Sequence, residues 1–273
     1  MEPIAAFRDA ASKTLGNALP ARRPGARTTE RRDELAFEWL ARVFIRHGCR
    51  WVVRTRIELT VEGREHIPVS GPVVIASRHF HHQWDAAIFL AVLPRSPHFL
   101  VALDWVRYRW HRSLLEWCCR LLRWPVILRR DGPRMDGPSA YRRCDVPAFM
   151  RRAAQDAILL LRAGECLTVF PEAFPNVDTV PTPKRSLEEF LPFRPGVVRL
   201  VVWAERGAQT RVPVIPAGLE YRRGRRWKVT LRFGPGIYVD ELDDRTCAAR
   251  LERQVRQLSG VRQSEARNGA TAT

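Results

Sequence analysis

Histidine and carboxylate residues gather in two short segments of the chain. The first is residues 78–85 (Arg-His-Phe-His-His-Gln-Trp-Asp), and the second is residues 170–176 (Phe-Pro-Glu-Ala-Phe-Pro-Asn). Each follows an apolar run typical of a buried strand, at 72–77 and 166–169. A histidine beside a carboxylate can take a proton from a hydroxyl, because the carboxylate orients the imidazole and stabilises its protonated form. No Gly-x-Ser-x-Gly motif occurs, so we expect the activated hydroxyl to belong to a substrate.

Composition indicates one sizeable core and a strong attraction for anions. The chain has 273 residues, 45% of them hydrophobic, and a formal net charge of +17 from 46 basic and 29 acidic residues. Such a charge attracts nucleic acid, acidic lipid surfaces or phosphorylated substrates. The sequence contains no helix-turn-helix, zinc-finger or RNA-binding signature, so we do not expect a nucleic-acid partner. The six cysteines show no Cys-x-x-Cys spacing, and we expect reduced thiols.

Two segments combine aromatic and basic side chains in a helical pattern. In residues 34–56 a charged residue recurs at every fourth position, and Gly48 can divide this helix in two. Residues 105–124 carry four tryptophans among five arginines. This composition is typical of helices at an anionic membrane interface, although ordinary packing with cation–π contacts is the alternative. We therefore expect a peripheral or monotopic protein at the cytoplasmic face of a membrane, without a transmembrane helix.

The hydropathy pattern predicts an α/β fold in which strands and helices alternate. We expect a single domain with a central mixed sheet flanked by helices, and an N-terminal amphipathic helical segment. The predicted organisation is a flexible basic arm at 1–33, the amphipathic segment at 34–56, a catalytic domain at 57–260 and a disordered tail at 261–273. Strands are expected at 57–62, 72–77, 98–103, 126–128, 166–169, 212–217 and 227–233, and helices at 34–54, 85–93, 105–124, 146–162, 195–203 and 244–258.

Taken together, these segments resemble the glycerolipid acyltransferase family, which includes the 1-acylglycerol-3-phosphate acyltransferases. That family has four blocks in order: a His and an Asp with four residues between them, a strand ending in Arg, Phe-Pro-Glu-Gly, and an apolar strand containing Val-Pro. The corresponding segments here are 79–85, 126–130, 170–176 and 212–217, and the resemblance covers residues 58 to 220.

The resemblance implies acyl transfer from acyl-CoA or acyl carrier protein to the hydroxyl of a lysophospholipid, with no cofactor or metal. The general base would be His79, oriented by Asp85. Five residues separate His79 from Asp85, whereas the family has four, and three residues separate His81 from Asp85. His81 therefore remains an alternative base, although His79 directly follows the strand as the family's histidine does.

The third block departs from the family where substrate phosphate is held. Ala173 replaces glycine, and Pro175 stands where the family carries an anion-binding arginine. The resemblance makes Arg130 the best remaining phosphate anchor. In the same substrate-binding set we place Glu172, which would orient the acceptor, and its neighbours and nearby basic residues: Arg129, Pro171, Ala173, Lys184 and Arg185.

Three alternatives stay open. The chain can be a lipid-binding relative that lost catalysis through its altered first block, or an acyltransferase whose acceptor carries no phosphate. A dinuclear metal hydrolase is suggested by the grouping of His79, His81 and His82 with Asp85. Such sites need further histidine ligands from later loops, and no histidine follows His111.

Overall fold

The computed structural model describes residues 28–129, 131, 139–239 and 244–261. The chain divides into two compact units, Met1–Trp39 and Leu40–Thr273. Helix α2 (Thr28–Arg56) is continuous through Gly48, so the expected division there is wrong. Residues 28–33 belong to this helix and not to a flexible arm, while residues 1–27 lie outside the described part. At the other end Val261 packs against the core, and the rest of the expected tail is also outside the described part.

Strands and helices alternate along the second unit, as the hydropathy pattern predicts. Short 3₁₀ helices span Arg64–His66 and Arg143–Asp145. The other elements are, in chain order, β1 (Ile57–Glu62), β2 (Val73–Ser77), α3 (Trp84–Val92), β3 (Pro97–Phe99), β4 (Val101–Ala102), α4 (Arg109–Leu122), β5 (Val126–Ile127), α5 (Val146–Arg162), β6 (Cys166–Val169), α6 (Gly196–Glu205), β7 (Val214–Arg222), β8 (Trp227–Phe233) and α7 (Asp244–Leu258).

The central sheet has six strands in the order β1-β8-β7-β2-β6-β3. Strands β7 and β8 are antiparallel, and the other neighbouring pairs are parallel, so the sheet is mixed as predicted. The apolar run at 98–103 does not form one strand. Its first part joins the central sheet as β3, and its second part pairs with β5 as β4 in a separate two-stranded sheet.

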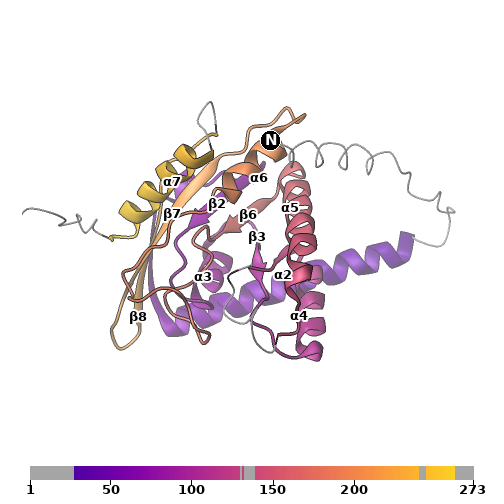
Figure 1. Cartoon of the computed structure of the whole chain (residues 1–273), viewed down its shortest axis with the longest axis horizontal. Coiled ribbons are helices and arrows are strands. Elements are labelled where there is room, and N and C mark those ends of the chain that lie inside the picture. The colour runs from indigo at the N-terminus through magenta and orange to yellow at the C-terminus, as the bar shows by residue number, and fades with distance from the viewer. Residues whose placement is uncertain (1–27, 130, 132–138, 240–243, 262–273) are drawn as a thin grey trace, which may run out of the picture. The chain divides into compact units, whose positions relative to one another are not determined.

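Helices cover both faces of the sheet, and strand β2 shows how the sequence dictates this. Val73 and Ile75 belong to a buried cluster with α3, whereas Val74 and Ala76 belong to a second cluster with α5, α6 and α7. Successive side chains of a strand point to opposite faces, so a fully apolar strand requires cover on both. Figure 1 shows α7 lying along β7 on the second of these faces.

The parallel pairing of β2 with β6 brings the two chemistry-bearing segments together. Both strands run in the same direction, so residues 78–85 and 170–176 leave the sheet at the same edge. Strand β7 lies beside β2 and extends beyond it, because Ser77 pairs with Ala217 and β7 continues to Arg222. Gly218 allows the end of α7 to approach β7 closely, since a Cβ there would lie 2.2 Å from the Leu258 backbone.

In the part of the chain that the structure describes, none of the helices is both long enough and apolar enough to span a membrane.

Candidate active site

His79 and Asp85 form a hydrogen-bonded pair at the edge where β2 ends. His79 Nδ1 lies 2.9 Å from Asp85 Oδ2. A carboxylate only accepts hydrogen bonds, so Nδ1 carries the proton and Nε2 keeps the lone pair that can accept another. The imidazole stacks on Phe170 at 4.3 Å and remains 16% exposed. The pair therefore has the geometry of a general base with one accessible nitrogen.

Asp85 organises the loop between β2 and α3 as well as the imidazole. It is fully buried in the first turn of α3, where the helix dipole favours a negative charge. Its Oδ2 also accepts the backbone N–H groups of Phe80 at 2.7 Å and His81 at 3.0 Å. These bonds explain how the extra residue between His79 and Asp85 is accommodated: the loop folds around the carboxylate.

His81 lies in the same loop with the opposite arrangement of its ring nitrogens. Its Nδ1 faces the backbone N–H groups of Gln83 and Trp84 at 3.3 and 3.4 Å, so it acts as the acceptor. Burial, with a contribution from His82, lowers the pKa of His81, which favours a neutral ring. The remaining proton of that neutral ring sits on Nε2, which is then a donor. The geometry therefore favours His79 over His81 as the base.

Glu172 reaches the same loop from the end of β6. The residue is 1% exposed. Its Oε1 accepts the backbone N–H of His79 and its Oε2 that of Leu191, both at 3.0 Å, while Lys184 Nζ lies 2.5 Å from Oε2. Both oxygens are bonded inside the protein, so the carboxylate holds the loop between β2 and α3 that carries His79. These contacts replace the acceptor-orienting role that the resemblance implied for Glu172.

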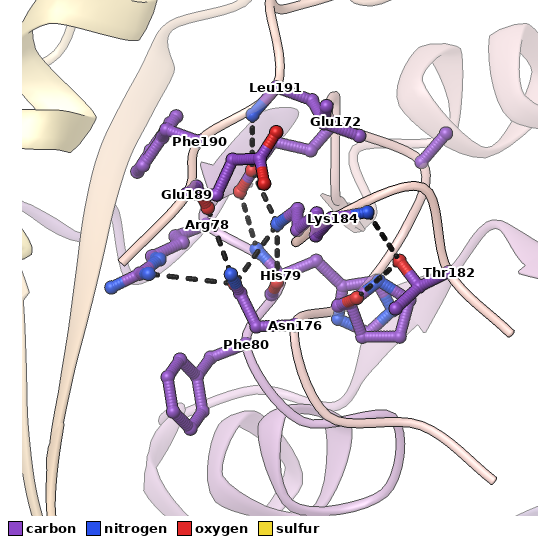
Figure 2. Close-up of polar contacts among 12 residues, drawn as sticks. Arg78, His79, Phe80, Glu172, Asn176, Thr182, Lys184, Glu189, Phe190 and Leu191 are labelled. Carbon is purple, nitrogen blue, oxygen red and sulfur yellow. Dashed lines mark hydrogen bonds and ion pairs between the residues drawn. The ribbon is translucent and has the colours of Figure 1, made fainter. Parts of the chain in front are cut away.

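Lys184 is not available as a phosphate contact. Its side chain is fully buried, and Figure 2 shows its ammonium between Glu172, Asn176 and the His79 backbone. Nζ lies 3.0 Å from both His79 O and Asn176 Oδ1. An ammonium has three protons, and the three acceptors use all of them. Burial lowers the pKa of Lys184, while Glu172 opposes that shift.

Arg129, too, is committed inside the protein. Its guanidinium forms a bidentate salt bridge with the buried Asp104, with Nε–Oδ1 and Nη2–Oδ2 distances of 2.9 Å. Its Nη1 donates to Ala173 O at 2.7 Å. This pair ties the end of β5 to the third block, and it is a structural role in place of the expected support for phosphate. Arg185 is exposed at the surface. Arg130 lies outside the described residues, so its assignment as phosphate anchor stays a prediction.

The turn after Phe170 explains why glycine would be favoured at position 173. Ala173 has φ 66°, in the left-handed region, and its N–H donates to Phe170 O at 2.9 Å. An alanine in this conformation costs about 1 kcal/mol relative to glycine. Pro171 is buried beside it, and its carbonyl accepts the Arg194 N–H at 3.2 Å. Pro171 and Ala173 therefore shape the turn that presents Glu172.

Tyr221 is a further residue of the site, and it lies outside the motifs that the sequence analysis singled out. Its hydroxyl donates to Asp85 Oδ1 at 2.7 Å, and its ring stacks on Phe80 at 4.3 Å. Burial, reinforced by the Asp85 charge, raises the pKa of Tyr221 well above its ordinary value, so the hydroxyl stays a donor. The alternation of Leu219 with Tyr221 continues the strand pattern beyond residue 217, and it is the signal that could have placed Tyr221 on β7.

The residues that the structure describes contain no group of three or more His, Cys, Asp or Glu side chains arranged to hold a metal ion.

Comparison with known proteins identifies the family of this chain. The family model described as Acyltransferase matches residues 58–220, more than half of the chain, and the chain belongs to that family. Among solved structures, the chain is similar to the crystal structure of the 1-acyl-sn-glycerophosphate (LPA) acyltransferase PlsC from Thermotoga maritima. The two share 16% identity with a TM-score of 0.49, over 96% of this chain and 90% of that one. No curated protein matches the chain.

Proposed function

We propose that this acyltransferase transfers a fatty acyl group from acyl-CoA or acyl carrier protein to the hydroxyl of a lysophospholipid such as 1-acylglycerol-3-phosphate. The observation that carries the proposal is the His79–Asp85 pair, in which the carboxylate binds Nδ1 and Nε2 remains free to accept a proton. Membership of the Acyltransferase family supplies the reaction type. The lysophospholipid and the donor come from the sequence resemblance.

The reaction needs a base and then an acid, and one imidazole can provide both. Nε2 of His79 removes the proton of the acceptor hydroxyl. The hydroxyl oxygen at the same time forms a bond to the thioester carbonyl carbon. Asp85 stabilises the imidazolium that results. When the carbon–sulfur bond breaks, the imidazolium returns its proton to the departing thiolate. The products are the acylated lipid and the free thiol.

We place this reaction at the cytoplasmic surface of a membrane, where the lipid acceptor resides. Helix α4 carries Trp110, Leu114 and Trp117 at intervals of four and three residues, and all three are at least 48% exposed. Such spacing puts them on one face of the helix. In the second unit, Leu40, Phe44 and Trp51 of α2 are also exposed and lie within a narrow arc of that helix. Exposed aromatic stripes of this kind suit an interfacial helix.

The function is tested by assaying the purified protein with an acyl-CoA and 1-acylglycerol-3-phosphate, following thiol release and the acylated product. His79→Ala should lower turnover by about 10² to 10⁴-fold, as expected for loss of a general base. The matched variant His81→Ala should retain turnover. An active His79→Ala with an inactive His81→Ala would move the base to His81, and two active variants would exclude this mechanism.

The acceptor is tested in the same assay by comparing 1-acylglycerol-3-phosphate with the 1-acylglycerol that lacks phosphate. We expect the phosphorylated acceptor to be preferred, with Arg130→Ala raising its KM far more than that of the donor, because a guanidinium can bind two phosphate oxygens at once. A higher rate with the unphosphorylated acceptor would instead favour the alternative of a non-phosphate lipid alcohol. Binding of lipid without turnover would favour the catalytically altered relative.

A further inference from the structure

The loop of residues 176–191, between β6 and α6, runs beside the loop between β2 and α3 that carries His79. Val177 N–H donates to Phe80 O at 2.7 Å, and His82 N–H donates to Val177 O at 3.1 Å. These bonds act like a short stretch of parallel pairing, which the bridge between His81 and Val177 also indicates. The backbone that follows His79 is therefore held by a second segment from the other side of the site.

Lys184 extends from this loop to the backbone of His79 itself. Its ammonium donates to His79 O at 3.0 Å, while its ion-pair partner Glu172 accepts His79 N–H at 3.0 Å. Both backbone polar groups of His79 are thus bonded to the two members of one buried ion pair, as Figure 2 shows. Hydrogen bonds with a charged partner are stronger than neutral ones, so this clamp fixes the backbone position of His79.

The loop that carries Lys184 is itself fastened to the site. Asn176 accepts from Lys184 Nζ at 3.0 Å and donates through Nδ2 to Ser186 O at 2.9 Å and Glu189 O at 2.8 Å. Arg78, which directly precedes His79, donates to Leu187 O at 2.7 Å. These bonds therefore hold the Lys184 ammonium at a defined position.

We propose that Lys184 is a positioning residue for catalysis: with Glu172 it clamps the backbone of His79, so that the imidazole meets the acceptor hydroxyl in a productive orientation. This inference rests on the proposed function. A buried ion pair contributes little to stability because both charges lose their hydration. It does, however, define geometry, and a displacement of about 1 Å at a reacting group can lower a rate by roughly 10²-fold.

The test compares Lys184→Met with Lys228→Met, which removes the same charge from an exposed lysine paired with Glu58 on the outer strands. Lys184→Met should lower kcat by about 10- to 100-fold with little change in either KM, because positioning acts on the reacting complex. The loss should be equal for acceptors with and without phosphate. Lys228→Met should behave as the unaltered protein. Full kcat in Lys184→Met, or a loss confined to the KM of the phosphorylated acceptor, would overturn the inference.

A second variant guards against misfolding, because Lys184→Met leaves Glu172 as a buried unpaired charge. The double variant Lys184→Met/Glu172→Gln removes both charges, and thermal unfolding of each variant shows whether it is folded at the assay temperature. A folded double variant with lowered kcat supports the clamp, and one with full kcat contradicts it. If the unaltered protein transfers no acyl group, the proposed function fails. If the unaltered protein transfers acyl groups and His79→Ala does not, the proposed function stands. Full activity of the Lys184 variants would then refute only the positioning role of Lys184.

Discussion

At the scale of single residues, Asp85 is the point on which the candidate site converges. Its two oxygens accept four hydrogen bonds, from His79, from two backbone N–H groups of the same loop and from Tyr221. A fully buried carboxylate needs such partners, because an unpaired buried charge is costly. Asp85 therefore fixes the loop, the imidazole and the end of β7 in a single arrangement.

Replacing Tyr221 with phenylalanine removes one donor to Asp85 and keeps the aromatic stacking on Phe80. A hydrogen bond to a charged group contributes about 1.5–3 kcal/mol, so we expect the free energy of unfolding to fall by roughly that amount.

Denaturant unfolding measures this change in the free energy of unfolding. The matched control is Tyr238→Phe, because Tyr238 is exposed. If Tyr221→Phe leaves the free energy of unfolding unchanged, the Tyr221 hydroxyl does not stabilise the buried Asp85 carboxylate.

These residues also show what the sequence could reveal about the site. His79, Asp85 and Glu172 were predictable because each lies in a short motif directly after a buried strand. The contact of Tyr221 with Asp85 depends on how far β7 extends beyond β2, and the burial of Lys184 depends on how the loop after β6 folds. Such long-range contacts cannot be inferred from local periodicity. The resemblance to the acyltransferase family placed Lys184 and Arg129 among the supporting phosphate contacts.

At the scale of elements, His98 joins β3 to the end of α4. The side chain is buried, and its Nδ1 lies 3.2 Å from Leu122 O and 3.1 Å from Arg123 O. Burial lowers the pKa of His98 from its usual range, although Glu165 on the neighbouring turn opposes the shift. This buried position between β3 and α4 therefore favours a neutral His98 imidazole.

This lowered pKa gives the fold a defined sensitivity to acid. Between the folded-state pKa and the unfolded value of about 6.5, the unfolded chain binds more protons than the folded one, so stability falls as pH decreases through that window. His98→Gln should flatten this decline, because glutamine does not titrate. Denaturant unfolding at several pH values below 7 measures the slope, and His47→Gln on the exposed surface of α2 is the control. An unchanged slope in His98→Gln would show that His98 does not carry the effect.

The elements themselves were predictable where the hydropathy pattern is long and regular. The helix expected at 146–162 and the strand at 57–62 have those bounds in the structure. The apolar run at 98–103 was expected as one strand, because periodicity cannot say that a chain leaves one sheet and enters another. Gly48 was expected to divide α2, but the cost of one glycine in a helix, about 1 kcal/mol, is smaller than the packing that Val53 and neighbouring residues supply.

At the scale of the whole molecule, the proposal of an anionic membrane partner rests on charge and on exposed aromatic surface. The net charge is +17, and α4 presents its tryptophan stripe among the exposed Arg107, Arg109 and Arg120. Attraction to anionic lipid is screened by salt, whereas burial of apolar side chains in the interface is not. The two contributions can therefore be separated by ionic strength.

We expect the purified protein to bind vesicles that contain anionic phospholipid more tightly than vesicles of neutral phospholipid at low salt, because only the former attract its positive charge. Raising the salt to about 1 M, where the screening length is roughly 3 Å, should weaken this preference and leave a residual apolar component. Trp110→Ser/Trp117→Ser should lower that residual binding by about tenfold or more, since burying each large apolar side chain contributes about 1.5–3 kcal/mol. Leu159→Ser, which removes an exposed apolar side chain of α5, should leave binding unchanged. Sedimentation of the protein with vesicles measures each case. Binding that disappears completely in high salt would assign the interaction to charge alone and exclude insertion of the α4 tryptophans.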